Sequence, residues 1–241
     1  MNFYQSIAHL YDYIFPLNKN HISFVQSAVT ELESKSIIDI GCGTGSFAIE
    51  LGKYVKNIVG IDLDEEMLQM ANAKNNLPNV VFEKGDMLHL AGKFENSFDS
   101  IICFGNTLVH LESFDEIDMF LKQCKCILHK GGKLLIQIIN YDRIIDNNID
   151  GLPTIENNFI KFERFYEHLP EEELIDFKTK LTDKKNKQIL ENSQMLYPIT
   201  QGELVCFLEK NLFRINNIFG DFNRGEFDKD SISLIIEAES K

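Results

Sequence analysis

The chain has 241 residues, of which 44% are hydrophobic and 25% are charged, so it can fold around a large core without disulfides or a metal. This composition excludes a disordered tail, a collagen-like repeat and a disulfide-stapled scaffold. With 24 basic and 37 acidic residues the net charge is −13, and a field of that sign repels nucleic-acid backbones and anionic membrane surfaces.

The five cysteines are scattered along the chain. Cys124 and Cys126 are close together, but their spacing is that of neither a zinc site nor a redox motif, and free thiols suit a reducing compartment. Residues 1–15 contain no basic segment followed by an apolar run, so we expect no signal peptide. No apolar stretch approaches the roughly 18 residues of a transmembrane helix. These features predict a cytoplasmic protein with no membrane partner and no metal.

Two helices are predicted at the N-terminus. The first has apolar residues at helical spacing between Phe3 and Ile14, and it ends before Pro16, which cannot continue a helix. The second extends from about residue 20 to residue 33 and has one apolar face. We expect residues 1–34 to form a helical lid.

Residues 36–139 alternate between short apolar runs and amphipathic segments. Continuous apolar runs are typical of buried parallel strands, and the segments between them have helical periodicity. The alternation predicts a parallel sheet covered by helices on both faces. Strands are expected at 36–40, 58–61, 80–82, 100–104 and 133–139, helices at 47–54, 65–75 and 115–128, and a turn at Gly131 and Gly132.

The alternation stops after residue 139. Three extended segments, at 159–166, 173–181 and 188–196, predict a small antiparallel sheet, with a polar turn at 183–186. Thr200 and Glu203 have the spacing of a capping box, which predicts a helix that extends to Lys210. Strands are expected at 213–219 and 231–239. Because no helix separates these two strands, we expect an antiparallel edge on the main sheet.

A glycine-rich turn follows the first predicted strand. Gly41, Gly43 and Gly45 have the spacing G-x-G-x-G, and glycines at a strand-to-helix turn let backbone N–H groups approach a ligand. A Rossmann fingerprint requires a glycine where Ser46 stands. A P-loop requires a Lys-Ser or Lys-Thr pair, which is also missing here. The motif therefore favours neither a dinucleotide nor a nucleoside triphosphate.

Two carboxylates follow the next two strands. Asp62 ends the second strand, where a carboxylate can accept hydrogen bonds from both hydroxyls of a ribose. Asp86 follows the third strand and can accept from an adenine amino group. Either residue alone would suit a loop or a helix cap, but both belong to the same edge of the predicted sheet as the glycine turn. Together these features indicate a nucleoside site.

The runs IIDIGCGTG at 37–45, GID at 60–62 and GDM at 85–87 resemble those of class I S-adenosylmethionine-dependent methyltransferases. The resemblance implies a doubly wound α/β fold with a seven-stranded, mostly parallel sheet of order 3-2-1-4-5-7-6, in which strand 7 is antiparallel. It implies S-adenosylmethionine as the cofactor and S-adenosylhomocysteine as the product. The cofactor residues that we expect are Tyr4, Tyr11, Asp39, Gly41, Gly43, Gly45, Asp62, Leu63, Asp86, Met87 and Phe104.

A second resemblance concerns the residues after the fourth and fifth strands. FGNTLVHL at 104–111 and NYD at 140–142 are similar to runs of glycine and sarcosine N-methyltransferases, in which an antiparallel insertion also follows. It implies that Asn106 and His110 line the active site, with His110 able to accept a proton and Asn106 able to hydrogen-bond to the acceptor. Those enzymes have an arginine where Ile139 stands, so glycine is a doubtful acceptor unless Arg143 or Arg164 substitutes.

We therefore expect a methyltransferase that acts on a small molecule, with an amine favoured, by in-line transfer. The alternatives are methylation of RNA or protein, which the net charge disfavours, and a non-catalytic cofactor-binding subunit. Residues 35–140 and 199–241 are expected to form the cofactor-binding domain. The inserted antiparallel subdomain at 141–198 would cover the acceptor site or make a dimer contact, and the protein would be a monomer or a homodimer.

Overall fold

The computed structural model describes residues 6–94 and 98–241 and contains two separate sheets. The larger sheet has seven strands in the order β10-β11-β5-β4-β1-β2-β3. All neighbours are parallel except that β11 is antiparallel to both β5 and β10, which confirms the predicted order and edge. Its strands are β1 (Ser36–Ile40), β2 (Asn57–Asp62), β3 (Val80–Lys84), β4 (Phe98–Cys103), β5 (Leu128–Ile139), β10 (Phe213–Phe219) and β11 (Ser233–Ser240).

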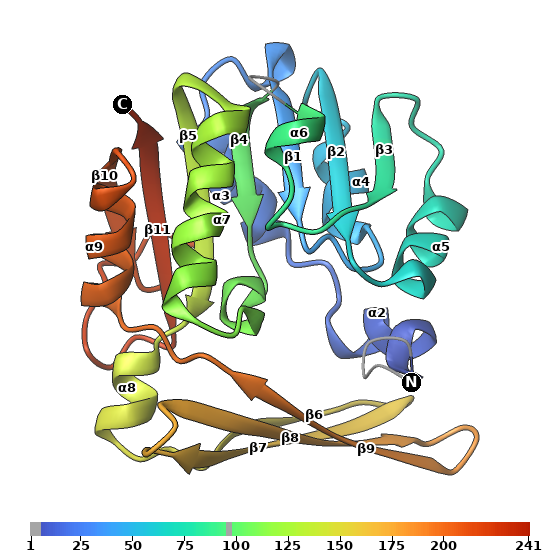
Figure 1. Ribbon diagram of the computed structural model, residues 1–241. Coiled ribbons are helices and arrows are strands. Elements are labelled where there is room, and N and C mark those ends of the chain that lie inside the picture. The colour runs from blue at the N-terminus through green and yellow to red at the C-terminus, as the bar shows by residue number, and fades with distance from the viewer. Residues whose placement is uncertain (1–5, 95–97) are drawn as a thin grey trace.

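Helices cover both faces of this sheet (Figure 1). Successive residues of a strand point to opposite faces, so Ile38 of β1 packs into the core beneath α7 and α9, whereas Ile37 packs into the core beneath α3, α4 and α5. No helix in the described part of the chain is long and apolar enough to cross a membrane. The helices are α3 (Lys19–Ala28), α4 (Ser46–Leu51), α5 (Glu65–Lys74), α6 (Ala91–Phe94), α7 (Phe114–Ile127), α8 (Tyr141–Asp146) and α9 (Gln201–Lys210).

The first N-terminal segment is helical throughout its described part, residues 6–14, whereas the second helix is shorter than the periodicity predicts. The described part of the first segment forms a 3-10 turn, η1 (Ala8–Leu10), followed by α2 (Tyr11–Ile14). The second helix, α3, ends at Ala28 instead of continuing to residue 33, and Glu31 has a left-handed conformation before the 3-10 turn η2 (Leu32–Ser34). Val29 and Leu32 are buried outside the α-helix, because tertiary packing overrides the weak helical preference of such a short segment.

The fifth strand also begins earlier than predicted. β5 starts at Leu128, and between the pairs Phe98 with Leu128 and Ser100 with Lys133 four residues of β5 stand opposite one residue of β4. The expected turn at Gly131 and Gly132 is therefore wrong: it is an excursion within the strand, and Gly131 takes a positive φ of 79° there. Another 3-10 turn, η3 (Thr107–His110), follows β4.

The second sheet is inserted between β5 and α9 and has the order β6-β7-β8-β9 with every neighbour antiparallel. It confirms the predicted antiparallel insertion but has a fourth strand that the sequence did not reveal. β6 contains Pro153, which is tolerated because β6 is an edge strand. In Figure 1 the inserted sheet lies below the seven-stranded sheet. The four strands are β6 (Gly151–Glu156), β7 (Ile160–Leu169), β8 (Leu174–Asp183) and β9 (Gln188–Leu196).

Asn140 joins this insertion to the main sheet at the end of β5. Its side chain is completely buried, and its Oδ1 accepts a hydrogen bond from the N–H of Arg143, which caps α8. Its Nδ2 donates to the carbonyl of Ser231, in the loop before β11, over 3.0 Å. One side chain therefore fixes both the start of the insertion and the chain that returns to the sheet edge.

Replacing Asn140 by alanine should destabilise the fold. We expect a loss of about 2–4 kcal/mol in the free energy of unfolding, because a helix cap disappears and a buried carbonyl loses its donor. Urea unfolding followed by circular dichroism measures this loss. The control is Asn147→Ala, which removes an exposed side chain of the same type that bonds to the Arg143 carbonyl. If both variants lose the same small amount, Asn140 has no anchoring role.

Candidate active site

Two adjoining cavities open where the carboxyl ends of the parallel strands face the inserted sheet. The larger, of about 320 Å³, receives side chains from the inserted sheet and is called the insertion lobe here. The smaller, of about 230 Å³, follows the ends of β1, β2 and β3 and is called the strand-end lobe. Both lobes are lined by Tyr11, Gly41, Phe104, Gly105 and His110, so they form one continuous cleft.

The glycine turn lies at the junction of the two lobes. The N–H groups of Gly41 and Cys42 both donate to the carbonyl of Ile61, which ties the turn to β2. Gly41, Gly43 and Gly45 have φ values of 72°, 53° and 75°, a region that favours glycine. Gly41 and Gly43 line the cleft. The turn therefore has the backbone geometry of a ligand-binding loop.

Gly45 is placed differently from the other two glycines of the motif. It is not among the described residues that line either lobe. A Cβ at this position would lie 2.5 Å from the ring of Phe82 and 2.8 Å from the side chain of Ala71. Glycine is thus required here because the start of α4 packs directly against β3 and α5.

Asp62 connects β2 to the glycine turn. Its Oδ2 accepts a hydrogen bond of 2.8 Å from the N–H of Gly43, and its Oδ1 accepts one of 2.9 Å from the N–H of Asp64. Burial raises the pKa of Asp62 despite these bonds. The side chain lines the strand-end lobe, and each oxygen keeps a lone pair for a further donor. The predicted ribose ligand therefore also holds the loop in place.

Asp39, in β1, is almost fully buried at the back of the insertion lobe. Burial, together with the nearby carboxylate of Asp62, raises the pKa of Asp39 to about 7. Two buried acids side by side repel each other when both are ionised. A cationic group bound in this part of the cleft would relieve that repulsion.

The other residues expected to frame the adenine also line the strand-end lobe. Asp86 accepts from the N–H of Leu88 over 2.9 Å and lies 3.1 Å from Nδ1 of His89. Leu63 has 62% of its surface exposed, whereas Met87 is buried. An exposed leucine beside a buried methionine offers an apolar surface for the flat face of a base.

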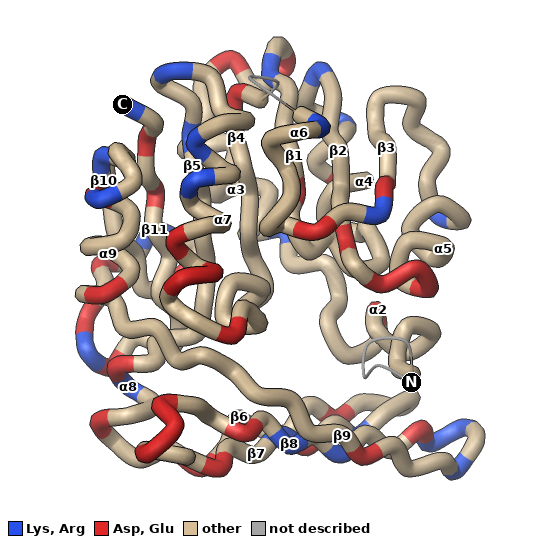
Figure 2. The backbone as a smooth tube through the Cα atoms, viewed as in Figure 1, with Lys and Arg blue, Asp and Glu red and all other residues tan. Residues whose placement is uncertain are grey.

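The described lining of the strand-end lobe contains acidic side chains and no lysine or arginine. Acidic positions also gather where β2 passes into α5, at 62–66 (Figure 2). Phosphate groups need N–H dipoles or cations around them, so a lobe of this charge disfavours a nucleotide. A nucleoside that carries a positive charge and no phosphate fits it.

Phe104 and Asn106 follow β4 and line the insertion lobe. Asn106 has a left-handed backbone, with φ of 68°. Its Nδ2 donates to the hydroxyl of Tyr141 and its Oδ1 accepts from the N–H of Ile139, both over 3.0 Å. Most of its hydrogen-bonding capacity therefore holds the loop after β4 against β5 and α8, and one Nδ2 hydrogen is left for a ligand.

His110 lies in the turn η3 and lines both lobes. Burial lowers its pKa to about 4, because a charged imidazole is poorly solvated in this environment. The ring is therefore neutral at physiological pH, and a neutral imidazole can accept a proton.

The N-terminal segment closes one side of the cleft. Tyr11 lies over the glycine turn: a Cβ at Gly43 would be 3.3 Å from its ring. The neighbouring Asp12, which sequence reasoning missed, accepts from the hydroxyls of Thr44 and Ser46 and forms an ion pair of 2.6 Å with Lys74. These contacts join α2 to the start of α4 and to α5. Tyr4, also expected to bind the cofactor, lies outside the described residues.

Three further polar side chains line the insertion lobe. Gln137 and Tyr166 are not among the residues expected from the sequence, whereas Arg164 is one of the two arginines left as alternatives. Gln137 accepts a hydrogen bond from the N–H of Gly105 over 2.8 Å, and it interrupts the apolar run at 134–139 of β5, a signal that the sequence contains. Arg164 and Tyr166 come from β7. Tyr166 is buried and hydrogen-bonds to Tyr141, and burial raises its pKa to about 12. Ile139 also lines this lobe, whereas Arg143 does not.

Comparisons with known proteins agree with this arrangement. Residues 37–132 match the family described as a methyltransferase domain. A putative methyltransferase of Geobacillus sp. (strain WCH70) is 32% identical over 143 residues, which are 56% of this chain and 57% of that protein. A glycine/sarcosine N-methyltransferase of Parasynechococcus marenigrum is 29% identical over 115 residues, which are 47% of this chain and 41% of that protein.

The chain thus spans about half the length of the curated relatives that it matches. A solved structure of an S-adenosylmethionine-dependent methyltransferase from Clostridium acetobutylicum superposes with a TM-score of 0.83 over 99% of both chains, at 16% identity. The fold is therefore shared over the whole chain, the inserted sheet included. Residues 37–132 therefore match the methyltransferase domain family, and the whole chain has the fold of the solved S-adenosylmethionine-dependent methyltransferase.

The raised pKa of Asp39 predicts a pH-dependent cost in stability. The folded protein holds a proton on Asp39 up to a pKa of about 7, whereas the usual value is 3.8. The stability that depends on this group therefore falls as pH rises from about 4 to 7. Because asparagine does not titrate, Asp39→Asn should raise the free energy of unfolding of the cofactor-free protein by ~1–3 kcal/mol at pH 8 and by less at pH 5.

Urea titrations of wild type and Asp39→Asn at both pH values measure this effect. The exposed Asp146 provides a matched control, since replacing it by asparagine removes the same charge without burial. A stability gain that is equal at pH 5 and pH 8 would contradict the raised pKa.

Proposed function

We propose that the chain transfers a methyl group from S-adenosylmethionine to a small-molecule amine and releases S-adenosylhomocysteine. The observation that carries this proposal is the division of one cleft into two lobes. The acidic strand-end lobe disfavours phosphate, the insertion lobe is covered by the inserted sheet, and the two meet at Gly41, Gly105 and His110. A methyl donor and its acceptor need two such adjoining spaces, because in-line transfer requires them to approach end to end.

The residues of the strand-end lobe have the donor and acceptor pattern that S-adenosylmethionine requires. Asp62 would accept from the ribose hydroxyls, and Asp86 and Met87 would frame the adenine between them and Leu63. At the edge of the neighbouring insertion lobe, Asp39 would offset the positive charge of the methionyl ammonium, while Tyr11 and Phe104, which line both lobes, would close over the glycine turn. When bound, the cofactor supplies an electrophilic methyl group on a sulfonium.

The chain's own contribution to the reaction is alignment and exclusion of water. Asn106 would orient the acceptor with the remaining hydrogen of its Nδ2, since Tyr141 and Ile139 hold its plane fixed. His110 is neutral at physiological pH and sits where the two lobes meet. It would accept the proton that an ammonium acceptor must lose before its lone pair can attack.

The size and covering of the insertion lobe support a small acceptor. The lobe measures about 320 Å³ and is bounded on one side by the inserted sheet and on another by α2.

The charge of the chain disfavours RNA as the substrate. Acidic and basic residues are interspersed along the chain in Figure 2, and the total charge is −13. Five free cysteines suit reaction in the cytoplasm.

Each part of the chain would have a separate task in this scheme. Residues 1–34 would act as the lid, 35–140 with 199–241 as the cofactor-binding domain, and 141–198 as the cover of the acceptor site. The ion pair between Asp12 and Lys74, with the hydroxyl bonds of Asp12 to Thr44 and Ser46, supports the closed position of the lid.

Replacing Asp62 by alanine tests the cofactor site. We expect the affinity for S-adenosylmethionine, measured by calorimetry, to fall by about 1–3 kcal/mol, because the ribose loses a charged acceptor and the glycine turn loses its tether. Glu65→Ala is the control: Glu65 lies nearby, pairs with Lys84 at the surface and lines neither lobe. Unchanged affinity in the Asp62 variant would remove this residue from the cofactor site.

The acceptor-side assignment is tested by Asn106→Ala combined with His110→Ala. We expect turnover to fall by about 100-fold or more, as general-base and positioning contributions are lost, while cofactor affinity stays within about threefold of wild type. A collapse of cofactor binding would instead assign both residues to the cofactor site or to the fold. The pH profile of turnover, measured with His110→Ala alone, separates proton acceptance from positioning.

The proposed function itself is tested by methyl-label transfer. The purified protein would receive methyl-labelled S-adenosylmethionine with a cell extract as the source of acceptors, and the products would be separated by size. Label in the small-molecule fraction, located on nitrogen by mass spectrometry of the product, supports the proposal. Label on RNA or protein contradicts it, and the absence of transfer despite tight cofactor binding would indicate a non-catalytic subunit.

A further inference from the structure

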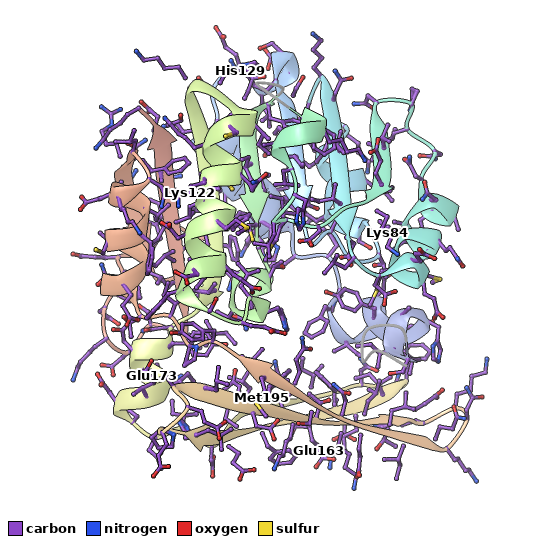
Figure 3. The ribbon with its side chains drawn as sticks, in the orientation of Figure 1. Lys84, Lys122, His129, Glu163, Glu173 and Met195 are labelled. Carbon is purple, nitrogen blue, oxygen red and sulfur yellow. The ribbon has the colours of Figure 1, made fainter. Side chains whose placement is uncertain are left out.

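Arg164 comes from the middle of β7 and faces the cleft. Residues of a strand alternate between its two faces, and Phe162 and Tyr166, two positions away on either side, are both buried, the first among residues of the N-terminal segment and the second in the core of the main sheet. The intervening Phe165 is 49% exposed, and Glu163 is labelled below the inserted sheet in Figure 3, on its outer side. The alternation therefore directs Arg164 into the insertion lobe, which it lines.

The guanidinium of Arg164 is held in position but has no anionic partner among the described residues. Its Nη2 donates to the carbonyl of Pro153 in β6, and its Cζ lies 5.8 Å from the ring centre of Phe162. Its Nε is completely buried and forms no hydrogen bond. Burial lowers the pKa of Arg164, as expected for a cation that is poorly solvated. A buried donor and a buried charge are both costly unless a ligand satisfies them.

Arg164 is also the sole lysine or arginine among the described residues that line the insertion lobe. The two histidines of that lobe, His21 and His110, have pKa values of about 4 and are neutral. The carboxylates of the lobe, Asp12 and Asp39, lie in α2 and β1, beside the glycine turn. The lobe is therefore acidic on the side of the main sheet and cationic on the side of the inserted sheet.

We propose that Arg164 binds an oxyanion of the methyl acceptor, so that the substrate class is a small amine that also carries a carboxylate or a phosphate. This inference rests on the proposed function. The apolar side chains of Ile139, Leu152 and Phe177 line the same lobe and would contact the body of the acceptor. Arg143, the other arginine near the insertion, does not line the lobe and provides a matched control.

An oxyanion could also come from the cofactor, whose methionyl group ends in a carboxylate. The placement of Arg164 favours the acceptor. The inserted sheet contributes Leu152, Arg164, Tyr166, Phe177 and Leu196 to the insertion lobe, but among the described residues it contributes only Gln194 to the strand-end lobe. Arg164 therefore lies on the inserted-sheet wall of the lobe, whereas Asp39, proposed to offset the methionyl ammonium, lies in β1 beside the glycine turn.

The first measurement detects an anion at Arg164 directly. Protein saturated with S-adenosylhomocysteine and labelled with nitrogen-15 in arginine would be titrated with sodium acetate and, separately, with sodium phosphate. We expect a saturable shift of the Arg164 Nε–H resonance, assigned by its loss in Arg164→Lys. Acetamide, or sodium chloride at equal ionic strength, should not reproduce it. If acetate and phosphate shift this resonance no more than sodium chloride does, the inference is wrong.

The second measurement separates the two sources of the oxyanion. Affinity for S-adenosylmethionine would be measured by calorimetry for Arg164→Met, with Arg143→Met as the control. An affinity within about twofold of wild type supports an acceptor site. A loss of tenfold or more in Arg164→Met alone means that the arginine holds the carboxylate of the cofactor, and the inference is then overturned.

The third measurement uses matched acceptors in the methyl-transfer assay. β-Alanine is paired with β-alaninamide, and O-phosphoethanolamine with ethanolamine, so that each pair differs in its anionic group. We expect kcat/KM for an anionic member to exceed that of its neutral partner by at least tenfold, and this preference to disappear in Arg164→Met but not in Arg143→Met. Transfer that favours the neutral members overturns the inference while the proposed function stands, whereas failure to bind S-adenosylmethionine defeats the proposed function itself.

Discussion

The cleft depends on the central position of β1 between β2 and β4. After β1 the chain continues to β2 on one side of it, whereas β4 lies on its other side. The connections that follow β1 and β4 therefore diverge and leave a crevice at the carboxyl ends of the strands. The glycine turn after β1 is then fixed to β2 by Asp62 and by the carbonyl of Ile61. Asp62 is therefore a structural tether of the glycine turn as well as the residue proposed to hold the ribose.

The electrostatics of the cleft follow from which elements surround it. Burial raises the pKa of both Asp39 and Asp62, and the nearby Asp62 carboxylate raises that of Asp39 further, so the main-sheet side of the cleft favours a cation. The inserted sheet brings Arg164 to the opposite side. Two ligands, one with a cationic group on the main-sheet side and the other with an oxyanion on the inserted-sheet side, would satisfy both walls.

The insertion acts through a small number of buried polar contacts. Asn140 anchors its first helix and the loop before β11, while Asn106 donates to Tyr141, which in turn bonds to Tyr166 in β7. The loop after β4 is therefore connected to the inserted sheet by a continuous chain of hydrogen bonds. Such a network holds the insertion lobe at a fixed distance from the glycine turn, as the proposed in-line methyl transfer requires.

The sequence by itself determined the strands β1 to β4, the capping box of α9 and the motif residues at the strand ends, because periodicity, caps and turns depend on neighbours in the chain. It missed β6, whose short run contains Pro153, and it left Arg143 and Arg164 as equal alternatives. Only the tertiary structure decided that Arg164 faces the cleft, that Asp12 binds Thr44, and that His110 is neutral. Burial and partnership of a side chain are set by elements far away in the sequence, and no local pattern contains that information.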